Sequence, residues 1–483
     1  MSSGFNEHTG ENVERHHSRC LFCTLGCGFD LATLRGEVAG LEYAGDSEVN
    51  RGALCSKGNY IPGLIDHPFR LTEPVTGDSP VSWSRALEDV ADRFRSHSSA
   101  VIIDGTASLE DIETARLFTR RCLGSDMFAV HVPTGDDAVV EALYRSGVSR
   151  LSIPRSRIEE ARCILAIGDP FDIGPIVAGS VLAARYRSHD TMFAVVSDGP
   201  NRTSPYASVR LQGDVRQILA DIIRALYVLP VIREKAPKWA DLLGNTVAEP
   251  ENVQYHQIAS SLTANEPVIV LETQDPVVAG LAGVIAMLTA TDAQVCYIGS
   301  YGNIGDIVTR IERTRTVNDV FDAIESGEVT ALLSLGADLV TGCSYRDVPS
   351  LLKKLDVFVA GSPFENDTTR LAGTILPTAL WCEVDGTCFG GLLEAAVEPP
   401  GGALSCGEIL NRLVSRMGTV LPADESEYRL EAAEMTPERV RELLDTAGES
   451  FISPAVRSSA VRFADGSLSG RASFATYAER GPV

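Results

Sequence analysis

Short, continuous apolar runs alternate with amphipathic stretches over most of the chain. Between the runs, apolar residues recur at helical spacing, as at Leu87, Val90 and Phe94 within a helix expected over residues 83–96. Continuous apolar strands separated by helices are typical of parallel sheets that helices cover on both faces. Two successive sets of runs therefore predict two doubly wound α/β domains. The first set lies at residues 100–103, 163–167, 191–196 and 207–211, and the second at 267–271, 295–299, 331–335 and 356–361.

The pattern differs in the first part of the chain. Residues 1–19 are polar and aperiodic, and they predict a flexible lead whose His8, His16 and His17 belong to a solvated tail rather than to a metal site. Short apolar stretches on both sides of Gly36 then predict a hairpin within a small β domain. We therefore expect five parts, namely a lead over residues 1–19, a small domain over 20–75, α/β domains over 76–235 and 236–418, and an extension over 419–483.

Composition and charge exclude several classes of function. The chain has 483 residues and a formal net charge of −23 at pH 7, which disfavours a nucleic-acid partner because phosphate binding needs a basic surface. Its apolar runs are interrupted by charge well short of the ~18 residues that a membrane span requires. We find neither a hydrophobic signal segment nor a twin-arginine signal, so we expect a cytoplasmic protein.

Four cysteines near the start of the chain carry the strongest chemical signal. Cys20, Cys23 and Cys27 lie in one short run, and Cys55 follows in the stretch Asn-Arg-Gly-Ala-Leu-Cys-Ser-Lys-Gly. Thiolates held on one compact turn can converge on a soft metal centre, and four of them complete the coordination of a [4Fe–4S] cluster. We therefore expect an iron–sulfur cluster at these four residues.

Two other interpretations of these cysteines stay open. Zinc also suits four thiolates, although most zinc sites pair two ligands with another two rather than three with one. Disulfides are a weaker interpretation because no export signal implies an oxidising compartment. The other cysteines are scattered and are interpreted as buried small thiols, at Cys122, Cys163, Cys296, Cys343, Cys382, Cys388 and Cys406.

Loops at the ends of the predicted strands are candidates for ligand binding. In parallel sheets, ligands bind beyond the carboxyl ends of the strands. Glycines there let backbone amides approach a phosphate group, and an arginine can pair with it. The candidate residues for a nucleotide-like ligand are Gly168, Asp169, Pro170, Asp198, Arg202, Gly302 and Asn303.

The cysteine run, residues 50–58 and residues 67–74 together resemble the N-terminal iron–sulfur domain of the molybdopterin oxidoreductases. The likeness is closest to formate dehydrogenase large subunits and to the B subunit of formylmethanofuran dehydrogenase. It continues more loosely through residues 168–170, 195–203, 302–305 and 375–387. The resemblance implies that the four cysteines hold a [4Fe–4S] cluster and that Lys57 lies between this cluster and a pterin. It also implies that the strand-end loops bind molybdopterin guanine dinucleotide carrying Mo or W.

The chain departs from this family in two places. Active relatives carry a Cys or selenocysteine followed by His, whereas the matching positions here are Val130 and His131. Valine cannot coordinate a metal, so His131 is the candidate catalytic residue, and His131, Asp136 or Asp137 would have to replace the missing ligand. The segment after Arg416 is also too short for the C-terminal barrel-like domain of the relatives. The expected fold is therefore a small N-terminal iron–sulfur β domain followed by two doubly wound α/β domains, lacking the full barrel domain.

Two functions follow from the resemblance. The first is the iron–sulfur subunit of a formate or formylmethanofuran dehydrogenase-like enzyme, which moves electrons between a Mo/W-pterin site and the cluster. The alternative is a non-catalytic electron-relay or scaffold subunit that has lost the Mo/W site. A zinc-stapled α/β binding protein is the third interpretation and requires the iron–sulfur assignment to be wrong. The expected partners are iron–sulfur or flavin electron carriers and a small subunit that completes the pterin pocket.

Overall fold

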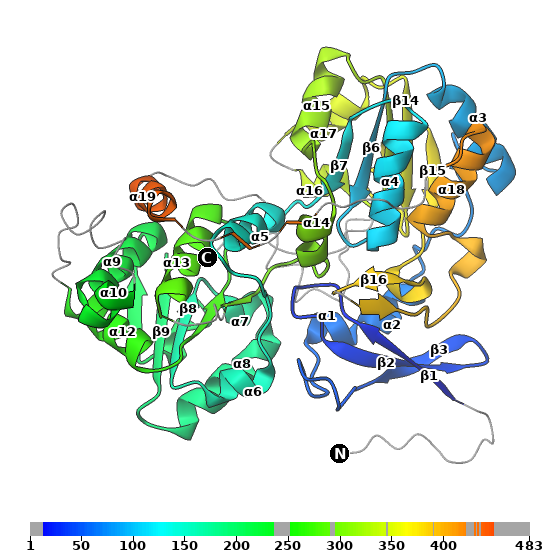
Figure 1. Ribbon diagram of the computed structural model, residues 1–483. Coiled ribbons are helices and arrows are strands. Elements are labelled where there is room, and N and C mark those ends of the chain that lie inside the picture. The colour runs from blue at the N-terminus through cyan, green and yellow to red at the C-terminus, as the bar shows by residue number, and fades with distance from the viewer. Residues whose placement is uncertain are drawn as a thin grey trace.

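The computed structural model describes residues 13–235, 252–289, 295–343, 346–389, 391–421, 429–430, 432–433 and 436–448. These residues form a mixed α/β structure with a small N-terminal β domain and two larger sheets that helices cover (Figure 1). None of the described helices combines the length and the apolar character needed to cross a bilayer.

The N-terminal domain is a three-stranded antiparallel sheet, followed by two short helices. Strands β2 (Gly28–Leu34) and β3 (Glu37–Glu42) form the expected hairpin, whose turn places Arg35 at φ 56° and Gly36 at φ 82°. Positive φ at both turn residues suits the right-handed twist of the strands. Helices α1 (Ser56–Asn59) and α2 (Ile61–Ile65) follow.

The expected flexible lead is wrong for its last six residues. Strand β1 (Glu14–Arg19) pairs with β2 along its whole length, and His17 Nδ1 lies 2.9 Å from Asp30 Oδ1 on the neighbouring strand. The segment lacks apolar alternation because ladder hydrogen bonds and cross-strand polar pairs, rather than a buried face, hold it at the edge of the sheet. Residues 1–12 lie outside the described part of the chain.

The first large sheet has five parallel strands in the order β10-β9-β8-β11-β12. The order reverses between β8 and β11, and ligands bind near such points in open α/β sheets. Helices lie on both faces of the sheet (Figure 1). The strands are β8 (Cys163–Ile167), β9 (Met192–Ser197), β10 (Val209–Gln212), β11 (Val268–Leu271) and β12 (Val295–Tyr297), and the helices are α6 (Arg155–Glu160), α7 (Pro170–Ile173), α8 (Pro175–Arg187), α9 (Val215–Val228), α10 (Pro230–Lys235), α12 (Val253–Ala264) and α13 (Pro276–Thr289).

The second large sheet has seven strands in the order β5-β4-β15-β14-β13-β6-β7, parallel except for the edge hairpin β4-β5. Its strands are β4 (Val75–Thr76), β5 (Ser79–Pro80), β6 (Ser99–Asp104), β7 (Phe128–His131), β13 (Ala331–Leu335), β14 (Val357–Ser362) and β15 (Thr374–Pro377). Its helices are α3 (Trp83–Phe94), α4 (Leu109–Arg121), α15 (Val317–Ser326), α16 (Leu339–Gly342), α17 (Val348–Leu352) and α18 (Cys406–Met417).

The expected grouping of strands into two successive sets is corrected by these pairings. Strand β6 pairs with β13 and β7 pairs with β6, so neither lies beside β8, whereas β11 pairs with β8 rather than with β13. The chain starts one sheet, builds the other and then returns to complete the first. An apolar run shows that a strand is buried on both faces, but long-range packing decides which strand lies beside it.

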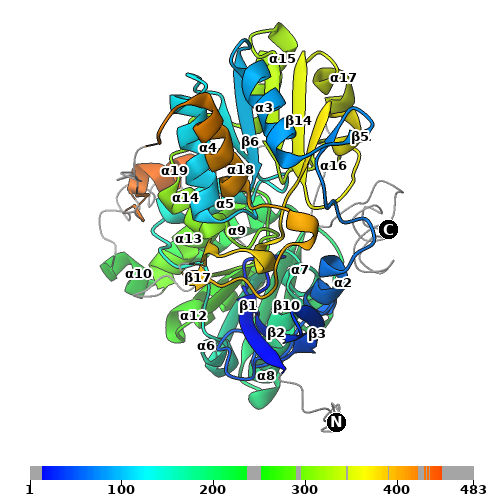
Figure 2. The same ribbon diagram turned by 90° about the vertical axis from the view of Figure 1, so that its right-hand side faces the viewer.

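Two connecting elements and one hairpin join these parts. Helices α5 (Asp136–Arg145) and α14 (Ile304–Arg310) lie between the two large sheets (Figure 1). The hairpin of β16 (Gly386–Cys388) and β17 (Gly391–Leu393) lies next to the N-terminal strands (Figure 2).

Further along the chain lies α19 (Pro437–Thr446). Its N-cap residue, Thr436, accepts a hydrogen bond from the Arg439 backbone N–H at 3.3 Å. The rest of the expected extension beyond residue 448 lies outside the described residues.

A buried ion pair links the N-terminal domain to the short helical turn at residues 381–383, which follows β15 of the second large sheet. Arg70 donates two hydrogen bonds to Glu383, at 2.6 Å and 2.8 Å, and the two side chains are only 4% and 0% exposed. Glu383 also accepts a hydrogen bond from the Leu380 backbone N–H at 2.8 Å. Removing one partner would leave the other charge buried and uncompensated.

We expect Arg70→Met to lower the stability of the chain by about 3–5 kcal/mol, because it leaves the Glu383 carboxylate buried without its partner. The urea midpoint measured by circular dichroism tests this. Arg15→Met is the control, because Arg15 pairs with Glu42 in an exposed position and its loss should cost less than about 1 kcal/mol. Equal midpoints for the two variants would contradict the expected role of the buried pair.

Candidate functional site

Three of the four cysteines lie on one closed loop between β1 and β2, which we call the cysteine loop (residues 20–27). The Cys20 backbone N–H donates to the Cys27 carbonyl at 2.9 Å and closes the loop, and Gly26 adopts φ 63°, a conformation that few other residues tolerate. Cys20, Cys23 and Cys27 are all buried in the described structure.

Asn50 brings the fourth cysteine to this loop. Its side-chain amide donates to the carbonyls of Gly28 at 3.0 Å and Ala53 at 2.8 Å, and its Oδ1 accepts from the Gly28 N–H at 2.9 Å. Cys55, half-buried, then stands at the N-terminal end of α1. All four cysteines are free thiols, so the structure pairs none of them in a disulfide.

The chemistry of these four thiols fits a positively charged metal centre. Burial and, to a smaller extent, the nearby Cys55 raise the pKa of Cys23 to about 11, although a backbone hydrogen bond at Leu25 and the Lys57 charge act to lower it. Burial, with the neighbouring Cys23 thiol, also raises the pKa values of Cys20 and Cys27 far above their usual range. The three buried thiols of the cysteine loop therefore need a nearby cation to stabilise their thiolate forms.

The described residues contain no group of three or more His, Cys, Asp or Glu side chains that converges on a single metal ion. In a [4Fe–4S] cubane, each thiolate binds a different iron, so the four ligands need not meet at one point.

The candidate loops after β8 and β9 are bound to each other. Asp169 accepts hydrogen bonds from the backbone N–H groups of Arg202 at 3.0 Å and Thr203 at 3.1 Å, and from the Thr203 hydroxyl at 2.6 Å. Glu272, at the end of β11, accepts from the Asp169 N–H at 2.9 Å, and Asn201 donates to the Gly168 carbonyl at 2.9 Å. The amides expected to face a phosphate therefore already donate to carboxylates of the chain.

The remaining candidates in this sheet differ in their surroundings. Pro170 is buried in the first turn of α7, and Asp198 is exposed. The Arg202 side chain lies 3.2 Å from the Asp172 carboxylate. The structure thus brings Gly168, Asp169 and Arg202 together. Glu272 and Thr203 complete their network. Thr203 ends the stretch 195–203 that carries part of the resemblance, whereas no sequence motif singled out Glu272.

The loop after β12, residues 298–303, contacts the cysteine loop directly, and we call it the β12 loop. The Gly302 N–H donates to the Leu21 carbonyl at 3.1 Å, and the Thr24 N–H donates to the Gly299 carbonyl at 3.0 Å. Asn303 begins α14 and donates to the Ala107 carbonyl at 3.1 Å. Gly302 and Asn303 therefore lie at the junction between the cysteine loop and the two large sheets.

His131 lies at the end of β7 in the other sheet and is buried. Its Nδ1 is 3.1 Å from Asp104 Oδ2, and its Nε2 has no hydrogen-bond partner among the described residues. Burial lowers the pKa of His131, but the neighbouring Asp104 carboxylate and Cys343 thiol more than offset this effect and raise the pKa to about 10. The Asp104 carboxylate therefore favours the protonated form of the imidazole.

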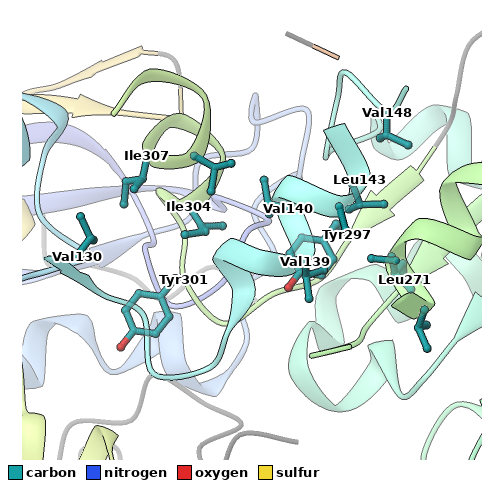
Figure 3. Packing of buried hydrophobic residues seen from close by; sticks show 14 of the residues in the cluster. Val130, Val139, Val140, Leu143, Val148, Leu271, Tyr297, Tyr301, Ile304 and Ile307 are labelled. Atoms are coloured by element: carbon teal, nitrogen blue, oxygen red, sulfur yellow. The ribbon is translucent and has the colours of Figure 1, made fainter. Parts of the chain in front are cut away.

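The positions expected to ligate a metal near His131 are occupied by other interactions. Val130 belongs to the main hydrophobic core, which also includes Val139 and Ile304 (Figure 3). Asp136 is 2% exposed and accepts four hydrogen bonds, and Asp137 pairs with Arg313 at 2.7 Å. Neither carboxylate is placed to replace a missing thiol ligand.

Comparisons with known proteins agree with the arrangement at the N-terminus. Residues 13–67 match the model of the molybdopterin oxidoreductase Fe4S4 domain. The F420-dependent formate dehydrogenase subunit alpha of Methanocaldococcus jannaschii is 25% identical over 474 residues, which covers 83% of this chain and 70% of that protein. An NADH-quinone oxidoreductase component from Shewanella oneidensis is 23% identical and covers 77% of this chain and 44% of that protein.

A solved structure with the same fold is acetylene hydratase from Pelobacter acetylenicus. It superposes with a TM-score of 0.65 at 15% sequence identity and covers 83% of this chain and 69% of that chain. This likeness concerns the fold.

We expect the charge on His131 to make the stability of the chain depend on pH. The pKa of His131 is about 10 in the folded chain and near 6.5 when unperturbed. The protonated imidazole therefore makes its full contribution to the free energy of unfolding below about pH 6.5, and this contribution is lost as the pH rises toward 10. His131→Gln should therefore show a smaller loss of stability than the wild type between pH 6.5 and pH 10, measured as urea midpoints. Parallel pH profiles for the two proteins would contradict this.

Proposed function

We propose that this chain, which carries the Fe4S4 domain of the molybdopterin oxidoreductases, is the iron–sulfur subunit of a formate or formylmethanofuran dehydrogenase-like redox complex. It would pass electrons through one [4Fe–4S] cluster bound by Cys20, Cys23, Cys27 and Cys55. The observation that carries this proposal is the set of four free thiols that the closed cysteine loop and Asn50 bring together. Its expected partners are iron–sulfur or flavin electron carriers.

The residues around the four thiols suit this role. A [4Fe–4S] cluster supplies reversible one-electron transfer when bound. Burial of Cys20, Cys23 and Cys27 keeps water away from the sulfur ligands, and Cys55 is the least buried of the four. The Lys57 ammonium lies close enough to Cys20 and Cys23 to favour their thiolate forms, so it would also stabilise an electron added to their metal centre.

Two forms of this function differ in whether the chain also holds a Mo/W-pterin. A catalytic subunit would bind molybdopterin guanine dinucleotide at the loops after β8, β9 and β12, with His131 beside the metal. The packing of Val130 in the core and the engaged carboxylates of Asp136 and Asp137 favour the second form, an electron relay or scaffold without the Mo/W site. The backbone amides of Arg202 and Thr203 also support the second form, because they donate to Asp169 and are not free to bind a phosphate group.

We expect anaerobically purified chain to be brown and to contain about four iron and four sulfide ions. Cys23→Ser should lose the colour and most of the iron, because the remaining thiolates cannot complete the coordination. Cys163→Ser is the matched control, since Cys163 is an equally buried thiol within β8 and should leave the iron content unchanged. Colourless wild-type protein that carries one zinc ion would overturn the proposal.

We expect the complex isolated from its native source to contain iron and sulfide but no Mo, W or pterin, because Val130 has no ligand atom, the carboxylates of Asp136 and Asp137 are engaged, and the His131 ring is held by Asp104. Metal analysis and pterin fluorescence after acid release measure this. Stoichiometric Mo or W with pterin would instead establish the catalytic form.

A further inference from the structure

Asp136 is a buried carboxylate at the first turn of α5 that binds the β12 loop. It accepts hydrogen bonds from the Tyr297 hydroxyl at 2.6 Å, the Ser300 N–H at 2.8 Å and the Tyr301 N–H at 3.1 Å, and from the Thr134 hydroxyl at 2.8 Å. Three of these donors belong to the segment that ends β12. The same packing brings Tyr297, Tyr301 and α5 together (Figure 3).

The segment held by Asp136 also holds the cysteine loop. Thr24, the residue after Cys23, donates from its hydroxyl to the Tyr297 carbonyl at 2.6 Å and from its N–H to the Gly299 carbonyl at 3.0 Å. Its hydroxyl accepts from the Gly299 N–H at 2.9 Å. Tyr297 therefore connects Asp136, through its own hydroxyl and carbonyl groups, to the neighbour of Cys23.

Only neutral hydroxyl and amide donors contact the Asp136 carboxylate among the described residues. Among the described residues, no Arg, Lys or His side chain forms an ion pair with Asp136, whereas the adjacent Asp137 has Arg313 at 2.7 Å. Hydrogen bonds from hydroxyl and amide groups stabilise a carboxylate without cancelling its net charge. Burial raises the pKa of Asp136, and the hydrogen bonds from Tyr297, Thr134 and Ser300 oppose this effect by stabilising the carboxylate. The ionised carboxylate places an uncompensated negative charge behind the cysteine loop.

We propose that Asp136 is a positioning residue that holds the β12 loop against the cysteine loop and lowers the reduction potential of the cluster bound there. This inference rests on the proposed function. A [4Fe–4S] cluster with four thiolate ligands becomes more negative when it accepts one electron, and a nearby uncompensated carboxylate opposes that change. Asp137 would not share this effect, because the Arg313 charge offsets its own.

A redox titration of the anaerobically purified full chain, followed by electron paramagnetic resonance, tests the proposal. Asp136→Asn preserves the shape of the side chain and removes its charge. It should raise the ratio of reduced to oxidised cluster at a fixed potential about tenfold, a shift of about +59 mV for one electron. Asp137→Asn is the matched control and should shift the potential less than a third as far.

Tyr297→Phe provides an independent measurement if Asp136→Asn does not fold. It removes a hydrogen bond that disperses the carboxylate charge, so the potential should move in the negative direction. Wild-type potentials in a cluster-loaded Asp136→Asn, or an unchanged or more positive potential in Tyr297→Phe, would overturn this inference alone. Wild-type protein without iron and labile sulfide would overturn the proposed function as well.

Discussion

The junction between the cysteine loop and the β12 loop is the interaction on which the rest of the arrangement depends. The hydroxyl and the backbone N–H of Thr24 both form hydrogen bonds at the end of β12, and the Gly302 N–H donates to the Leu21 carbonyl of the cysteine loop. These hydrogen bonds lie in the buried interior, where unpaired polar groups would be costly. The small N-terminal domain is therefore fixed to the carboxyl end of a parallel sheet, the edge at which such sheets bind ligands.

This junction places the four thiols in an electrostatically uneven environment. Lys57 favours negative charge on the sulfur atoms, whereas burial and the uncompensated carboxylate of Asp136 oppose it. The balance would set how readily a metal centre in the cysteine loop accepts an electron. The buried polar junction can thus hold the two loops together and also set the electrostatic potential at the four thiols.

The sequence was most informative where local rules decide the structure. The hairpin around Gly36, the apolar strands and the helix expected over residues 83–96 follow from turn chemistry, burial and helical periodicity, and the structure has all three. The cysteine run likewise identified the candidate site from spacing alone. The pairing of β6 with β13 and the edge strand β1 were not predictable in this way, because each depends on a partner elsewhere in the chain. Thr24 and Glu272 were not recognised as parts of the site for the same reason, and Asp136 was expected only as a replacement metal ligand.

The residues beside His131 give the strongest argument about how far the likeness to catalytic relatives extends. A metal ligand must present a lone pair to an accessible position, yet the Val130 side chain is apolar and packs in the core. The Asp136 carboxylate is held by four donors, and releasing it would leave the Ser300 and Tyr301 amides buried without partners. Recruiting Asp136 to a metal would therefore loosen the same junction that holds the cysteine loop. The Asp136 side chain cannot both ligate a metal and hold the β12 loop, and its hydrogen bonds from the Ser300 and Tyr301 amides show that it holds the loop.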